Sequence, residues 1–119
     1  YDGHGYLYIP EQSSLTASLI PKSGNSTRCK VHVHKLDTVV KALRVPRVDF
    51  IKIDAEGAAL KVLNGSVETI KKYKPKIIIA VRDENLKYLI NFLEKCNYHV
   101  ILKVFGIGKH KELFIYATP

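Results

Sequence analysis

The sequence predicts an α/β fold built around a mostly parallel sheet, in a single domain that spans residues 1–119. Predicted strands and helices alternate along most of the chain, which is typical of a doubly wound sheet. The run Lys76–Val81 (KIIIAV) is almost continuously apolar, as expected of a strand buried on both faces of a parallel sheet. The last two predicted strands have no helix between them, which indicates that the sheet ends in an antiparallel hairpin.

The first part of the chain is predicted to hold two strands, a long loop and a helix. Gly5–Ile9 is short and aromatic, and Lys30–His34 alternates basic residues with valine, so both are predicted strands. Between them, residues 10–28 are rich in Ser, Pro, Gly and Asn and predict a flexible loop. Asp37 stands where an N-cap is expected for a helix over Thr38–Leu43.

The rest of the chain alternates strands and helices more regularly. Leu86, Leu89, Ile90 and Leu93 have the spacing of an amphipathic helix, and the pair Asn64 and Gly65 is typical of a helix end. The predicted strands are Val48–Asp54, Lys76–Val81, Tyr98–Phe105 and Leu113–Ala117, and the predicted helices are Ala58–Leu63, Val67–Tyr73 and Asn85–Cys96.

Composition narrows the classes of function. No apolar run approaches the roughly 20 residues of a membrane-spanning helix, and no signal peptide is visible, so a cytoplasmic protein is expected. Cys29 and Cys96 lack zinc-site spacing and predict free thiols. The net charge of +8 would suit nucleic acid, but the lysines are scattered, so solvated basic faces are favoured over nucleic-acid binding. His32 and His34 share a strand face without a third ligand nearby, and no metal site is predicted.

The turn from Asp54 to Gly57 is the predicted chemical site. Side chains alternate along a strand, so Lys52 and Asp54 share one face and are expected to pair. Asp54 stands at the carboxyl end of its strand, where open α/β sheets gather ligands, and Glu56 follows at a helix start that favours its charge. Gly57 lets backbone or ligand approach closely. The two carboxylates could hold a cation, orient a hydroxyl or accept its proton, or they could only support the following helix.

The stretch Val48–Pro75, VDFIKIDAEGAALKVLNGSVETIKKYKP, resembles the signature region of FkbM-type methyltransferases, in which a strand ends in KID and is followed by x-EG and a helix. Leu36 and Asp37 are similar to the family's LD before a short helix, and Ser14 and Leu15 to its SL loop. The resemblance implies a partial Rossmann-like class I methyltransferase fold. It also implies an enzyme that uses S-adenosylmethionine to methylate a hydroxyl of a sugar or small metabolite.

The resemblance also implies roles for single residues. Asp54 would be the base or hydroxyl orienter, Glu56 would assist it or bind a cation, and Lys52 would keep Asp54 ionised. Ser14, Asp54 and Gly57 would contact the substrate under a lid formed by the loop after the first strand. No residue is assigned to the cofactor, because the family's opening strand and Gly-rich turn are absent, so weak or no cofactor binding is expected of this chain alone.

Other interpretations stay open. Ala59 and Ala80 stand where the family commonly has acidic residues, which also suits a noncatalytic binding module that has lost its chemistry, and a basic nucleic-acid-binding domain is a third alternative. The chain begins at Tyr1 and not at Met, so it is expected to be the C-terminal portion of a longer protein without its N-terminal strands. The strand Val48–Asp54 would then have an unpaired edge, which predicts self-association or a partner that supplies the missing half.

Overall fold

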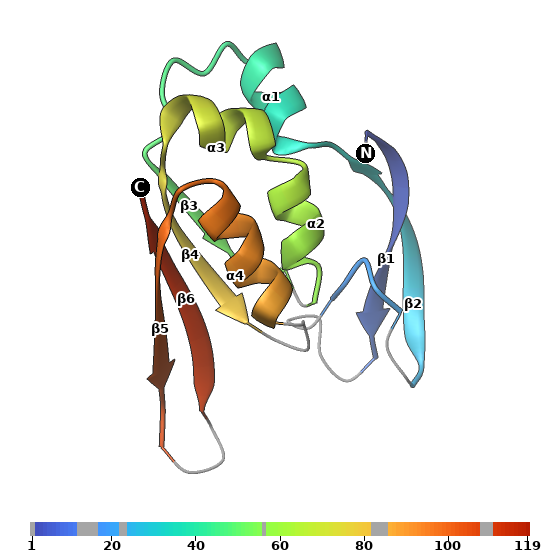
Figure 1. The fold of residues 1–119 in the computed structure, drawn as a ribbon. Helices are drawn as coiled ribbons and strands as arrows, with labels where there is room; N and C mark the ends of the chain where they lie inside the picture. The colour runs from blue at the N-terminus through green and yellow to red at the C-terminus, as the bar shows by residue number, and fades with distance from the viewer. Residues whose placement is uncertain (1, 12–16, 22–23, 56, 82–85, 108–110) are drawn as a thin grey trace.

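The structure is a computed structural model that describes residues 2–11, 17–21, 24–55, 57–81, 86–107 and 111–119. Figure 1 shows the order of the strands and helices. The strands are β1 (Gly3–Pro10), β2 (Ser26–Val33), β3 (Phe50–Ile53), β4 (Lys76–Val81), β5 (His99–Phe105) and β6 (Glu112–Thr118). The helices are α1 (Leu36–Ala42), α2 (Ala59–Asn64), α3 (Val67–Tyr73) and α4 (Leu86–Lys95). Every predicted element is present, and α3 and β4 have the predicted bounds.

The main sheet has mixed orientation, with the strand order β3-β4-β6-β5. Among the described strands of this sheet, only the neighbours β3 and β4 are parallel, because β6 lies between β4 and β5 and is antiparallel to both. This arrangement corrects the prediction of a mostly parallel sheet. A short connection can return a strand only in the antiparallel sense, whereas a parallel neighbour needs a crossover. The predicted terminal hairpin is confirmed by the register from His99↔Thr118 to Phe105↔Glu112.

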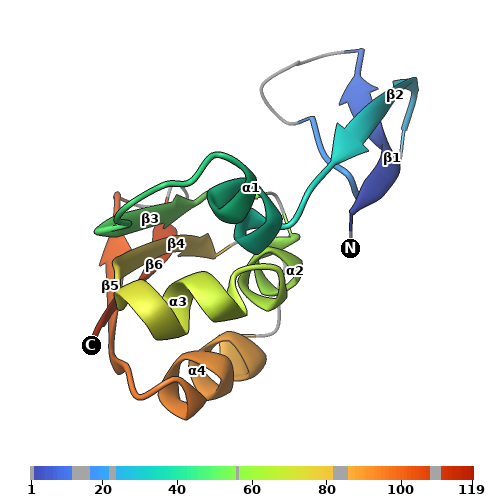
Figure 2. The same ribbon diagram turned by 90° about the horizontal axis from the view of Figure 1, so that it is seen from above.

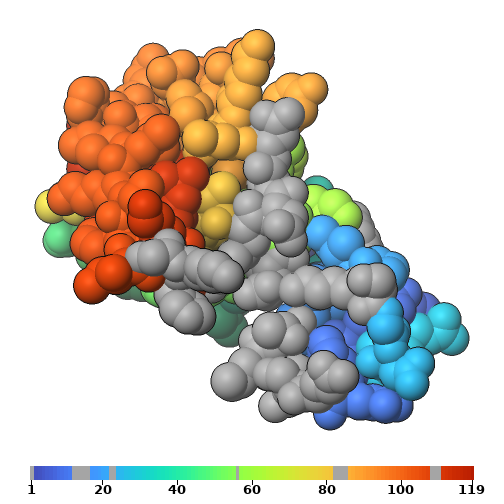
Figure 3. Space-filling view, turned by 90° about the horizontal axis from the view of Figure 1, so that it is seen from below, coloured from blue at the N-terminus to red at the C-terminus, as the bar shows by residue number. Residues whose placement is uncertain are grey.

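The first two strands form a sheet of their own, so the predicted strand Lys30–His34 is not part of the doubly wound sheet that the sequence predicts. β1 and β2 pair antiparallel from Gly3↔Val33 to Pro10↔Ser26. The strands therefore extend into both ends of the predicted loop over residues 10–28, since β1 ends at Pro10 and β2 begins at Ser26. Ser18 forms a further β-bridge to Tyr8. Figure 2 shows the hairpin beside the α/β body, and in the space-filling view of Figure 3 its side chains lie away from those of α4, β5 and β6.

The hydrophobic core lies between the main sheet and the helices α2, α3 and α4, which share one of its faces (Figures 1 and 2). The amphipathic spacing predicted for the last helix is confirmed, because Leu89 and Leu93 on α4 are buried. Each fully buried aliphatic side chain stabilises the fold by about 1.5–3 kcal/mol relative to an exposed one. The largest fully buried aliphatic side chains are Leu63, Ile70, Ile77, Ile79, Leu89, Leu93 and Ile115.

Strand β3 lies at one edge of the described sheet, with β4 as its only neighbour there. Its residue Phe50 is exposed. An edge strand presents unpaired backbone groups to which another chain can bind. The geometry that motivated the prediction of self-association is therefore present, and self-association itself stays a prediction.

Two further properties follow from the described part of the chain. Cys29 and Cys96 form no disulfide, as the sequence predicts. Within the described ranges, no helix has both the length and the apolar character needed to cross a membrane.

Candidate active site at the end of strand β3

Lys52 and Asp54, two of the residues predicted to carry chemistry, meet at the carboxyl end of β3. Lys52 and Asp54 share a face of the chain, and the Lys52 Nζ lies 3.5 Å from the Asp54 Oδ2, which confirms the predicted pair. Their side chains are 60% and 41% exposed, so solvent screens the attraction and both groups stay accessible to a ligand. A charged, accessible pair thus stands where α/β sheets commonly bind ligands.

The turn after Asp54 depends on Gly57. This residue has a φ of +89°, a backbone conformation that an L side chain would strain. A Cβ at Gly57 would also meet the Ile20 Cδ1 at 3.5 Å, which is ordinary contact, so the backbone angle and not the space demands glycine. The Ala58 N–H then donates to the Ala55 carbonyl oxygen at 2.9 Å and closes the turn before α2.

Ile20 brings the hairpin loop to the same turn. The loop is attached to β1 by backbone hydrogen bonds between Ser18 and Tyr8, of 2.8 and 3.0 Å. The Ile20 N–H in turn donates to the Ser18 hydroxyl oxygen at 3.0 Å. The site is therefore built from two parts of the chain, the end of β3 and the described part of the loop that follows β1.

Two predicted site residues, Ser14 and Glu56, lie outside the described residues. The structure brings together Lys52, Asp54 and Gly57, and their predicted roles in catalysis and substrate binding remain predictions. Within the described ranges, no group of three or more His, Cys, Asp and Glu side chains could hold a metal ion.

Ala59 and Ala80 have structural roles that the sequence did not reveal. Ala59 is fully buried at the start of α2, and Ala80 is 4% exposed on β4. Their small side chains are therefore part of the packed interior, where an unpaired carboxylate would be costly.

Two open hollows in the described surface lie away from Asp54. One, of about 500 Å³, lies between α1 and α3, and the other, of about 470 Å³, lies at the amino ends of β3 and β4. Neither is lined by Lys52, Asp54 or Gly57. Charged residues of the first include Lys41, Arg44, Glu68 and Lys72, and those of the second are Arg47, Asp49, Lys74 and Lys76.

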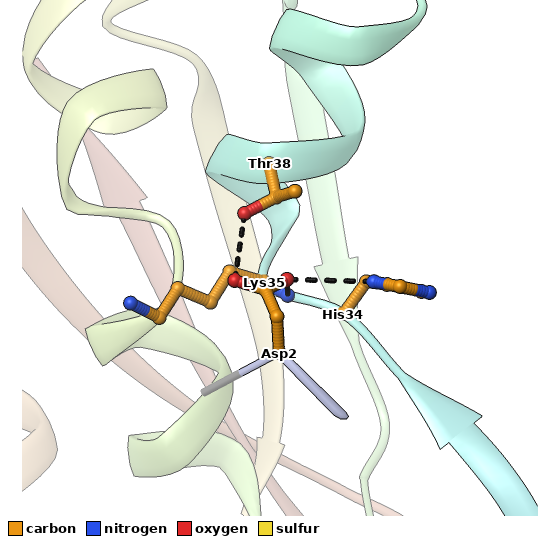
Figure 4. Close-up of polar contacts among 4 residues, drawn as sticks. All are labelled: Asp2, His34, Lys35 and Thr38. Atoms are coloured by element: carbon orange, nitrogen blue, oxygen red, sulfur yellow. Dashed lines mark hydrogen bonds and ion pairs between the residues drawn. The ribbon is translucent and has the colours of Figure 1, made fainter. Parts of the chain in front are cut away.

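Sequence reasoning missed Asp2, which joins the hairpin to the body (Figure 4). Its carboxylate accepts hydrogen bonds from the Lys35 backbone N–H at 3.0 Å and the Thr38 hydroxyl at 2.9 Å, and the His34 Nδ1 lies 3.4 Å away. The backbone hydrogen bond from Lys35 has the largest effect and lowers the pKa of Asp2. Loss of solvation has the next largest effect and raises this pKa, and the contacts with Thr38 and His34 lower it further. Asp2 thus links the hairpin to the residues at the start of α1 from a distant part of the chain.

Asp37 also stabilises a helix, but not the predicted one. Helix α1 begins at Leu36, so Asp37 lies inside its first turn and is not its N-cap. Its carboxylate instead accepts the backbone N–H groups of Glu68 and Thr69 at 3.1 and 2.8 Å, at the start of α3. These N–H groups have no partner within their own helix. The prediction failed because capping here is tertiary and not local.

The fold and the turn define a mixed α/β domain with an accessible ion pair at the carboxyl end of a strand. A comparison with family profiles matches residues 2–100 to the methyltransferase FkbM domain. The match spans the chain from β1 into β5, and the protein belongs to the FkbM methyltransferase family. Neither the curated proteins nor the solved structures contain a match to this chain.

Proposed function

We propose that this protein transfers a methyl group from S-adenosylmethionine to a hydroxyl oxygen of a sugar or another small metabolite. Family membership supports methyl transfer. The observation that carries the proposed chemistry is the Asp54 carboxylate, which is accessible at the carboxyl end of β3 with Lys52 beside it. A cytoplasmic setting is part of the proposal, since the thiols of Cys29 and Cys96 would stay reduced there.

Asp54 would serve the acceptor hydroxyl. When bound, S-adenosylmethionine supplies the methyl group, whose bond to sulfur breaks as its bond to the acceptor oxygen forms. The acceptor oxygen must lose its proton in this step, and an Asp54 carboxylate oxygen would take it up. Positioned general bases of this kind typically contribute about 10²–10⁴-fold to the rate. Lys52 would position the carboxylate through the contact of 3.5 Å.

The described residues at the turn are assigned to the acceptor side of this reaction. The two hollows described above are not lined by Lys52, Asp54 or Gly57, and no described residue is assigned to the cofactor. Use of S-adenosylmethionine therefore rests on the family. Ile20, which lies over Gly57, would form an apolar wall beside the acceptor.

The substitution Asp54→Asn tests the role of the carboxylate. The protein is incubated with S-adenosylmethionine and a panel of monosaccharides, and the release of S-adenosylhomocysteine is measured. We expect Asp54→Asn to lower kcat by about 10²–10⁴-fold because the amide cannot take up the proton. Asp49→Asn is the matched control, since Asp49 is an exposed acid paired with Arg47 outside the turn, and it should keep the full rate.

Calorimetric titration with S-adenosylhomocysteine separates chemistry from cofactor binding. We expect Asp54→Asn to bind this product as the unchanged protein does. An Asp54→Asn variant that retains the full rate would refute the assigned role. Turnover of none of the monosaccharides would refute the sugar acceptor. Because weak binding is expected of this chain alone, the cofactor would be refuted if neither this chain nor a longer chain from the same gene bound S-adenosylhomocysteine.

A further inference from the structure

One face of the β1–β2 hairpin carries rings and cations side by side. The antiparallel register places Tyr8 opposite Arg28, Tyr6 opposite Lys30, and His4 opposite His32. Residues two positions apart on a strand share a face, so these three pairs form one row. We call this row the hairpin strip, and its residues are His4, Tyr6, Tyr8, Arg28, Lys30 and His32.

Contacts between the side chains confirm that they share this face. The Arg28 guanidinium lies over the Tyr6 ring, 4.3 Å from its centre. The rings of His4 and His32 have centres 4.3 Å apart. The His34 ring, just beyond β2, is parallel to that of His32 within 2°, with the centres 6.4 Å apart. These contacts group Tyr6 with Arg28, and His4 with His32 and His34, on the face that the register defines.

The hairpin strip is accessible and positive. Tyr6 is 44% exposed, and His4, Arg28, Lys30 and His32 are exposed as well. The acid at the end of this row, Asp2, is engaged with the start of α1 and with His34. Arg28 and Lys30 therefore carry positive charge beside exposed rings, in a chain whose net charge is +8. This charge favours a polyanion as the ligand.

We propose that the hairpin strip binds a single strand of nucleic acid, with phosphates near Arg28 and Lys30 and bases stacked on the Tyr and His rings. Proteins that bind single strands combine cations that follow the backbone with aromatic rings on which bases stack. The sequence analysis disfavoured nucleic-acid binding because the lysines are scattered along the chain. The hairpin strip is not visible in the sequence, because its residues are far apart there and only the pairing of β1 with β2 brings them together.

Spacing favours a single strand over a duplex. Rings two residues apart on a strand are separated by about 6.6 Å, which is close to twice the rise of about 3.4 Å between stacked bases on one strand of a duplex. Bases that lie on successive rings must therefore separate from one another, and a single strand allows this where a duplex does not. The binding goes beyond the proposed methyl transfer and does not depend on it.

Fluorescence anisotropy of the whole protein with a labelled oligothymidylate tests the proposal. We expect binding that weakens steeply as the salt concentration rises from about 50 to 200 mM, because phosphate contacts release counterions. Tyr6→Ala and Arg28→Ala should each weaken binding by about tenfold or more, through lost stacking and a lost phosphate contact. Tyr88→Ala and Lys103→Ala are matched controls, because Tyr88 is exposed on α4 and Lys103 is exposed on β5, and both should leave binding within about twofold.

Two competitors distinguish base stacking from general attraction to polyanions. An unlabelled single strand should displace the probe more effectively than heparin, which has no bases, or a duplex of the same length. Absence of binding at low salt would overturn the proposal. So would a Tyr6→Ala variant that binds as tightly as the unchanged protein, or heparin or a duplex that competes as well as the single strand.

Discussion

The hairpin and the α/β body are held together by different physical means. Among the described residues, every fully buried hydrophobic side chain belongs to the body, from Ile53 onward. The strands of the hairpin have half-buried or exposed side chains and are joined to each other by backbone pairing. A two-stranded hairpin by itself is marginally stable in water, so its links to the body matter. Among the described residues, one such link is Asp2, which accepts hydrogen bonds at the start of α1, and Ile20 lies near Gly57.

The two regions therefore differ in how they tolerate substitutions. The body is close-packed, so a change of one buried side chain affects the whole domain. The hairpin can change its exposed side chains at little cost to stability, which suits a surface that binds ligands. The turn at Asp54 lies where the two regions approach each other, because a Cβ at Gly57 of the body would meet the Ile20 side chain of the hairpin loop. Substitutions in the two regions should therefore have effects of very different size.

The largest loss of stability is expected in the body. Leu63 on α2 is fully buried, so Leu63→Ala should lower the free energy of unfolding by about 2–5 kcal/mol through lost burial and the cavity left behind. Leu19→Ala in the hairpin loop is the matched control, since Leu19 is exposed and should cost about 0.5 kcal/mol or less. Urea unfolding followed by circular dichroism measures both. Equal losses would contradict the division between the two regions.

A smaller loss is expected where α1 stabilises the start of α3. Asp37→Ala leaves the N–H groups of Glu68 and Thr69 without their acceptor and should cost about 0.5–2 kcal/mol. Asp49→Ala removes an acid from an exposed pair with Arg47 and should cost less, about 0–1 kcal/mol. Thermal unfolding of both variants checks the order. A larger effect at Asp49 would show that Asp37 is not the cap inferred here.

A comparable loss that depends on pH is expected at Tyr98. Its hydroxyl donates to the Pro75 carbonyl oxygen at 2.7 Å, so Tyr98→Phe should cost about 0.5–1.5 kcal/mol. Burial raises the pKa of Tyr98 from 10.0 to about 12. The fold thus favours the protonated phenol, and its contribution is complete below pH 10 and is lost as the pH rises to about 12.

Unfolding measured across that pH window tests the assignment to Tyr98. The difference in stability between the unchanged protein and Tyr98→Phe should shrink as the pH approaches the raised pKa. Tyr88→Phe serves as the control, since Tyr88 is exposed and its loss should not change the slope. A slope that persists in Tyr98→Phe would assign the titration to another group.

The smallest effect on the whole domain is expected at Asp2. The pKa of Asp2 lies below its ordinary value of 3.8, so the fold favours the ionised carboxylate. This contribution is present above pH 3.8 and is lost as the pH falls through the lowered pKa. Asp2→Asn should speed amide hydrogen exchange at Lys35 and along β1 and β2, with little change in global unfolding.

Glu11→Gln is the control for Asp2, since Glu11 is an exposed acid just beyond β1. It should leave exchange in the hairpin unchanged. Loss of global stability in Asp2→Asn as large as that in Leu63→Ala would show that the hairpin and the body unfold together.

Much of the local structure could be predicted from the sequence. The apolar run of β4 and the periodic pattern of α4 are local signals, and both elements formed where they were expected. The Lys52 and Asp54 pair was predictable for the same reason, because alternation along a strand places both side chains on one face. Asp37 was assigned to the wrong helix because only its own neighbours in the sequence were considered.

The sequence by itself determined the positions of the strands and helices, the charged turn after β3 and the family to which the chain belongs. The tertiary structure alone decided which strands pair, so that β6 lies between β4 and β5 and the hairpin forms a separate sheet. It also decided that Asp2 holds the start of α1 and that His4 lies beside His32. The physical reason is that propensity and periodicity act over a few residues, whereas pairing between distant segments depends on how the whole chain packs.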